Sequence, residues 1–167
     1  NTGQFPRAAL EAAIGRKDEI IPSLLDVLQR STDDLLRTKE DKKRMDYTFA
    51  MFLLAQFRER KAYPLLCRFF SGLEGDAYWF CGDIITEDLP RLWASVFDGN
   101  LEPLVAIAEN PRIDQFVRMA ALKAMGILYL YGDLDRERIT ETFRKLMDDT
   151  EVKKNSDVIG DLVYQSQ

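Results

Sequence analysis

Three carboxylates lie close together near the middle of the chain, at Asp83, Glu87 and Asp88. If this segment folds into a tight turn before a helix, their oxygens converge, and hard cations such as Mg²⁺, Mn²⁺ and Ca²⁺ prefer oxygen ligands. A cation held there would activate a water molecule. One hypothesis is therefore a divalent-cation-dependent, hydrolase-like enzyme that uses these three carboxylates.

The same carboxylates also have a structural explanation. Residues 89–97 carry apolar side chains at the spacing of an amphipathic helix, and Asp88 is placed to cap that helix through its side chain. The remaining polar residues are predicted to serve in the turn or as an ion pair four residues apart: Asp83, Thr86, and Glu87 with Arg91. Because no calcium-loop motif accompanies the cluster, we favour helix capping or contact with a partner, and we expect no bound metal.

The chain has two cysteines and no histidine. Without histidine, a Ser-His-Asp site, a Cys-His site or a His-ligated metal cannot form within this chain. Cys67 and Cys81 lie in apolar stretches, which is typical of small buried hydrophobic residues in a reducing compartment, and two cysteines alone cannot make a zinc site. The composition therefore predicts no cofactor and favours a role without catalysis.

The acidic excess is concentrated in one part of the chain. The formal net charge is −5, but residues 73–110 hold eight acidic residues against one basic residue, Arg91, while the rest of the chain has a net charge of +2. An acidic surface disfavours phosphate backbones and favours basic partners. We therefore expect a basic protein or peptide partner and no nucleic acid, although such charges can also simply keep a helical face solvated.

A group of aromatic residues flanks the carboxylates: Tyr78, Trp79, Phe80 and Trp93. At helical spacing, such residues are most often part of a hydrophobic core, and we expect that role here. The alternative is that Trp79 or Tyr78 lines a groove and holds a peptide, since exposed tryptophan and tyrosine beside charges are frequent binding hot spots.

The hydrophobic pattern is helical throughout, with no convincing strand pattern. Pro22, Pro64 and Pro103 are each predicted to start the second helix of a pair, and they lie 42 and 39 residues apart. Paired helices repeating at about 40–47 residues are typical of HEAT and armadillo proteins. The sequence therefore predicts an all-α fold, a right-handed α-solenoid (an α-α superhelix) of HEAT-like pairs, formed by a single domain over residues 1–167.

Further local expectations concern the ends of helices. In the first half of the chain, we expect a short helix bounded by Pro6 and Gly15, and a long charged connection over residues 31–46. We expect Asp46 to cap an interior helix over 47–57 that is covered on both sides.

In the second half, Asp98-Gly99-Asn100 is predicted to form a turn, and Asn110-Pro111 to end a helix. Asp114 and Asp135 are predicted N-caps, and Gly132 is predicted to end the helix that Asp114 begins.

No apolar run reaches the length of a membrane span, so we expect no membrane partner and a cytoplasmic location. The chain begins at Asn1, and its last residues break off inside a helical pattern. We expect a chain trimmed at its C-terminus.

Three segments resemble a bacterial family of uncharacterised proteins, the domain of unknown function 1186 family. They are Phe5-Pro-Arg-Ala-Ala-Leu-Glu-Ala-Ala13, Ala50-Met-Phe-Leu-Leu-Ala-Gln-Phe-Arg58 and Gly82-Asp-Ile-Ile-Thr-Glu-Asp-Leu89. The resemblance extends from residue 5 to about residue 147, and the third segment is its most specific part. It implies HEAT-type helical repeats and no established activity.

The favoured interpretation is a protein–protein interaction or scaffold module that binds a basic or helical protein segment through a concave acidic face. The candidate binding residues are Asp83, Thr86, Glu87, Asp88, Arg91 and Trp79.

Overall fold

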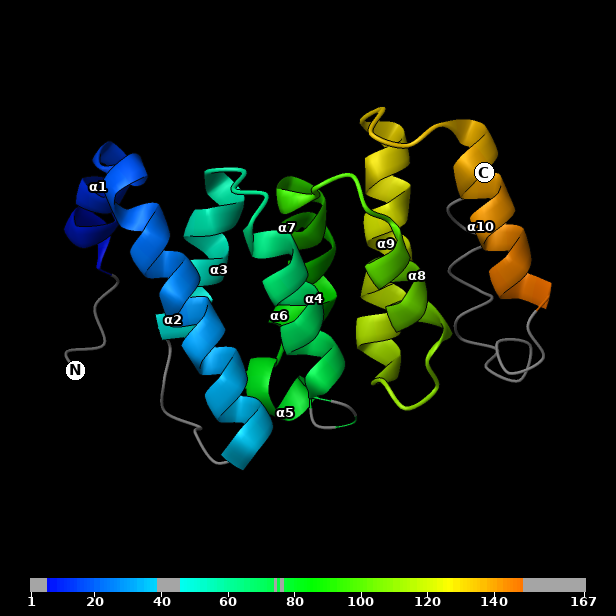
Figure 1. The fold of residues 1–167 in the computed structure, drawn as a ribbon, viewed down its shortest axis with the longest axis horizontal. Coiled ribbons are helices and arrows are strands. Elements are labelled where there is room, and N and C mark those ends of the chain that lie inside the picture. The colour runs from blue at the N-terminus through cyan, green and yellow to red at the C-terminus, as the bar shows by residue number, and fades with distance from the viewer. Residues whose placement is uncertain (1–5, 39–45, 74, 76, 149–167) are drawn as a thin grey trace.

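The protein is described by a computed structural model that covers residues 6–38, 46–73, 75 and 77–148. The secondary structure of these residues is helical, without strands, as the sequence predicts (Figure 1). The helices are α1 (Arg7–Gly15), α2 (Lys17–Thr38), α3 (Asp46–Gln56), α4 (Ala62–Gly72), α5 (Ala77–Cys81), α6 (Ile84–Glu87), α7 (Leu89–Val96), α8 (Glu102–Glu109), α9 (Gln115–Leu130) and α10 (Arg136–Asp148).

The helices pack in two rows that follow the order of the sequence. In one row α2 contacts α4, α4 contacts α8, and α8 contacts α10; in the other, α3 contacts α7 and α7 contacts α9. The rows also contact each other, because α3 packs on α2 and α4, and α9 packs on α8 and α10. Figure 1 shows the result, with α1 at one end of the molecule and α10 at the other.

The core lies between the rows and is rich in aromatic side chains. Trp93 of α7 is fully buried and meets Phe70 of α4 edge to face, with ring centroids 5.7 Å apart. Tyr63 of α4 is also fully buried, and its hydroxyl donates a hydrogen bond of 2.9 Å to the carbonyl oxygen of Asn100, in the loop after α7. Burial raises the pKa of Tyr63, so this donor keeps its proton.

The predicted ends of α9 are confirmed. The Asp114 carboxylate accepts hydrogen bonds from the backbone N–H groups of Phe116 (2.8 Å) and Val117 (3.3 Å). At the other end Gly132 has a φ of +81°, and the N–H groups of Gly132 and Asp133 bond back to the last turn of the helix. This is a Schellman motif, which needs a left-handed residue that glycine supplies without strain.

Other predicted boundaries are confirmed as well. The Asp135 carboxylate accepts a bond of 2.7 Å from the Arg138 N–H at the start of α10. The Asp98-Gly99-Asn100 turn closes through a 2.9 Å bond from the Asn100 N–H to the Asp98 carboxylate, with φ at +103° for Gly99. Pro64 and Pro103 lie in the first turns of α4 and α8.

Helix α2 corrects two predictions. Pro22 does not open a helix, because it lies inside α2, which begins at Lys17. Residues 31–38 are not a connection either, since α2 continues to Thr38; residues 39–45 lie outside the described part. The physical reason is a helical stripe among the charges: Ser31, Thr32 and Leu35 are buried, and the Thr32 hydroxyl donates to the Leu28 carbonyl oxygen at 2.7 Å.

Helix α3 is not covered on both sides. Tyr47, Ala50 and Leu54 are buried, as expected for an interior helix, but Phe49 and Phe52 are exposed. The described helices that pack on α3 are α2, α4 and α7, and they leave this face open.

Arg118 is a buried cation that sequence reasoning missed. It is 3% exposed, and its Nε donates a 2.9 Å hydrogen bond to the carbonyl oxygen of Ala108, in the last turn of α8. Carbonyls in a last turn have no partner within their own helix, and a cation there also opposes the negative end of the helix dipole. Arg118 therefore joins α9 to the end of α8.

We predict that Arg118→Met lowers the free energy of unfolding by about 1.5–3 kcal/mol, because a charged hydrogen bond is lost and a buried carbonyl loses its donor. Urea denaturation would measure the change. Arg112→Met is the matched control, since Arg112 is exposed in the loop before α9, and we expect a change below about 0.5 kcal/mol. Equal losses in the two variants would contradict this role for Arg118.

Candidate functional site

The six candidate residues lie on three short elements in the middle of the chain. Trp79 is on α5, Thr86 and Glu87 are on α6, and Arg91 is on α7, while Asp83 and Asp88 flank α6. The Thr86 hydroxyl donates to the Asp83 carbonyl oxygen at 3.2 Å, and the Tyr78 hydroxyl lies 3.4 Å from the Asp83 carboxylate.

The predicted side-chain cap at Asp88 is wrong. Asp88 has helical dihedral angles, with φ −115° and ψ −34°, and its side chain accepts no bond from the first turn of α7. Its backbone carbonyl accepts instead, from the N–H groups of Arg91 and Leu92 at 2.9 Å each. An N-cap needs an extended backbone to turn its side chain back onto the helix, whereas here α6 runs almost directly into α7.

The three carboxylates do not form a cation site. Among the described residues no three Asp, Glu or Cys side chains come together in a group that could hold a metal ion. The expected ion pair between Glu87 and Arg91 is not among the salt bridges of the described residues either. Asp83 and Glu87 are exposed, and Asp88 is half-buried.

Several described carboxylates of the acidic segment lie on different elements of the fold. Asp88 precedes α7 and Asp98 follows it, so the two carboxylates stand at opposite ends of an eight-residue helix, about 12 Å long. Glu102 and Glu109 lie on α8, which packs in the other row. The fold thus disperses charges that are close in the sequence.

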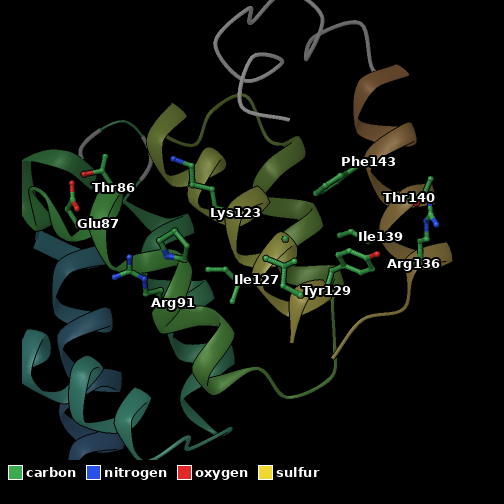
Figure 2. Close-up of a pocket in the computed structure, with 13 residues that line it drawn as sticks. Thr86, Glu87, Arg91, Lys123, Ile127, Tyr129, Arg136, Ile139, Thr140 and Phe143 are labelled. Carbon is green, nitrogen blue, oxygen red and sulfur yellow. The ribbon is translucent and has the colours of Figure 1, made fainter. Parts of the chain in front are cut away.

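A groove of about 690 Å³ contains three of the candidate residues (Figure 2). Residues of α6 and α7 form one wall, α9 forms the floor, and α10 forms the other wall. Its lining is Thr86, Glu87, Pro90, Arg91, Lys123, Gly126, Ile127, Tyr129, Leu130, Arg136, Ile139, Thr140 and Phe143. Asp83, Asp88 and Trp79 lie outside this lining.

The groove is basic rather than acidic. Three cations line it, Arg91, Lys123 and Arg136, against one carboxylate, Glu87, which gives a formal charge of +2. Lys123 and Arg136 come from α9 and α10, beyond the acidic segment of the sequence. The groove that contains Thr86, Glu87 and Arg91 therefore has a basic lining, whereas the acidic binding face expected from the sequence stays a prediction.

The floor of the groove is apolar. At 3.6 residues per turn, the outward face of α9 carries Phe116, Met119, Lys123, Ile127 and Leu130. In the floor, Leu130 is 79% exposed and Ile127 is half-buried, while exposed Phe116 and half-buried Met119 lie on the same helix face outside the groove lining. The hydrophobic pattern of this helix predicts apolar residues that include Phe116 and Ile127, but it does not tell which of them the fold leaves exposed.

The expectation that the aromatic group belongs to the core is right for Trp93 and for Phe80, which is half-buried against the core, and wrong for Tyr78 and Trp79 on α5. Trp79 is 69% exposed and Tyr78 is exposed, and the Tyr78 ring contacts Phe116 with centroids 6.2 Å apart. The reason is that α5 buries Ala77 and Cys81, four residues apart, which turns Tyr78 and Trp79 outward while Phe80 packs against the edge of the core.

Comparison with known proteins identifies the family. A sequence profile of the family described as "Protein of unknown function (DUF1186)" matches residues 1–167. The chain belongs to this family. The resemblance seen in the sequence is thereby confirmed.

Two DUF1186 relatives come from Chlamydia. One, an "Uncharacterized protein" of Chlamydia trachomatis serovar D, is 35% identical over 156 residues, which are 93% of this chain and 62% of the relative. Another, an "Uncharacterized protein" of Chlamydia muridarum, is 35% identical over 147 residues, 88% of this chain and 59% of the relative. The chain thus spans about three fifths of these relatives, and no solved structure is significantly similar to it.

None of the helices in the described part of this DUF1186 chain is long and apolar enough to cross a membrane.

The two cysteines are buried in the core, as the sequence predicts. Burial raises the pKa of Cys67 to about 12, and it raises that of Cys81 to about 12 as well. Both therefore stay protonated at neutral pH, and the thiolate needed for nucleophilic or metal-binding chemistry does not form.

We predict that neither thiol of the native protein reacts with Ellman's reagent at pH 8, and that both react at once in denaturant. Colour development at 412 nm measures the reaction. Single Cys67→Ala and Cys81→Ala variants assign any signal to one residue. Rapid reaction of a native thiol at pH 8 would contradict the raised pKa values.

Proposed function

We propose that this DUF1186 chain is a protein–protein interaction module that binds a segment of a partner protein in the groove over α9. The proposal includes the solenoid reading of the fold, a right-handed superhelix of HEAT-like pairs with a concave side, and a cytoplasmic location. Support for the solenoid comes from the two rows of helices that contact each other in sequence order.

The observation that carries the proposal is the combination of an apolar floor with a charged rim. Leu130 and Ile127 offer apolar area, and Arg91 and Arg136 stand on opposite walls. Exposed apolar patches rimmed by polar residues mark interaction sites, and arginine and aromatic residues dominate binding energies there.

The chemistry of the described residues favours binding over catalysis. The chain has no histidine, both cysteines are protonated in the core, and the described carboxylates form no metal-binding group. No observation favours the hydrolase-like alternative at Asp83, Glu87 and Asp88. As in the sequence analysis, the proposed partner is a protein segment. Because the groove lining is basic, however, we now expect this segment to be acidic rather than basic.

The proposal predicts that peptides selected on this protein from a random display library depend on Leu130. Leu130→Ser should weaken their binding by about 10–100-fold, because burying a leucine side chain contributes about 1.5–3 kcal/mol. Fluorescence anisotropy of the labelled peptides measures the dissociation constants.

Tyr131→Ser is the matched control. Tyr131 is the next residue along the chain and is 82% exposed, but it does not line the groove. Its substitution should leave binding unchanged within about twofold. Selected peptides that bind both variants as tightly as the unmodified protein would overturn the groove as the binding site.

A further inference from the structure

We infer that the occupant of this groove is an amphipathic helix of a partner protein, with its apolar side on α9 and carboxylates along its flanks. The inference rests on the proposed function and names the class of partner. It follows from three features of the groove: an uncovered apolar helix face, the length of that face, and the placement of the cations.

The first feature is that α9 has apolar residues on both sides. Its inward side packs into the core through Val117, Ala121, Met125 and Leu128, all buried. Its outward side carries Phe116, Met119, Ile127 and Leu130, with Lys123 among them; Phe116 and Leu130 are exposed, and Met119 and Ile127 are half-buried. Apolar residues on the outer side of a helix normally pack against another element, so this side of α9, Lys123 apart, has the composition of a packed face.

The second feature is the shape of this face. Helix α9 has 16 residues and is therefore about 24 Å long. The groove lining takes the part of α9 from Lys123 to Leu130, and beyond it the same helix face continues through Met119 to Phe116, which is next to Tyr78. A stripe of this kind is covered by a second helix whose apolar residues recur at i, i+3, i+4 and i+7, the helix-in-groove mode of recognition.

The third feature is where the charges stand. Figure 2 shows Arg91 on the α7 side of the floor and Arg136 on the α10 side, with Lys123 between them on α9. A partner helix that lies on the floor has one flank facing each wall. Carboxylates on one flank then lie near Arg91, and those on the other flank lie near Arg136. Glu87 is the single acidic side chain of the lining, and it lies one turn from Arg91 on the same wall.

The experiment uses a designed, fluorescein-labelled peptide of about 16 residues. Its apolar stripe is made of leucines at helical spacing, and glutamates occupy the flanks. A second peptide replaces every glutamate by lysine, and a third has the first composition in scrambled order. Anisotropy titrations on the whole chain give the three dissociation constants. We expect the glutamate peptide to bind at least about tenfold more tightly than either of the others.

A charge-swapped variant tests the assignment of the walls. Arg91→Glu combined with Arg136→Glu should reverse the preference, weakening the glutamate peptide and strengthening the lysine peptide. Arg138→Glu is the control, because Arg138 lies on the opposite side of α10 from the groove lining and is exposed. Circular dichroism melts confirm that each variant is folded. A reversal with Arg138→Glu unchanged supports the inference.

The outcomes separate the inference from the proposed function. If library peptides depend on Leu130 but are basic, or if the scrambled peptide binds as tightly as the helical one, the groove is a binding site and the acidic helix is wrong. If the lysine peptide binds equally well, or a DNA oligonucleotide displaces the glutamate peptide at equal charge concentration, the acidic helix is also wrong. If no peptide depends on Leu130, both the inference and the proposed function fail.

Discussion

The packing of α9 against α7 and α8 determines what this molecule presents to its surroundings. The inward side of α9 includes small side chains such as Ala121 and Ala124, which let neighbouring helices approach closely. Both ends of the helix are fixed, by the Asp114 cap and by the turn at Gly132. Because its ends and its inward side are fixed, α9 cannot rotate about its axis to bury its outward side. Apolar residues of that side therefore line the groove.

The electrostatics of the groove follow from the same arrangement. Arg91, Lys123 and Arg136 lie on three different helices, and they line one groove because α7 and α10 both pack beside α9. Asp88 and Asp98 stand at opposite ends of α7, so carboxylates that are close in the sequence lie on different parts of the fold. The charge of the groove lining therefore differs from the net charge of the sequence window that contributes Glu87 and Arg91, because neighbours in the fold decide the local charge.

What could be predicted from the sequence depended on local chemistry. Asp114, Asp135, Gly132 and the Asp98-Gly99-Asn100 turn act within a few residues of themselves, and their roles were predictable. The all-α class and the family were predictable from periodicity and from a specific segment.

The failures concern how segments join and pack, which hydrophobic spacing alone does not show. Asp88 looked like a cap because the sequence does not show that α6 leads straight into α7. Trp79 looked like core because the pair that α5 buries, Ala77 and Cys81, is small and less conspicuous than the aromatic residues between them. The groove itself depends on α10 packing beside α9, which no single segment encodes.

Hydroxyl-radical footprinting of the free protein, read by mass spectrometry, tests most directly the claim that the outer face of α9 is an open surface. Residues of one type must be compared, since intrinsic reactivities differ between types. We predict that Tyr129, which lines the groove, is oxidised much faster than the buried Tyr63. The exposed Trp79 and the buried Trp93 form a second pair of one residue type, and we predict the same difference between them. Protection of Tyr129 equal to that of Tyr63 would mean that the chain covers this face itself, and it would contradict the account.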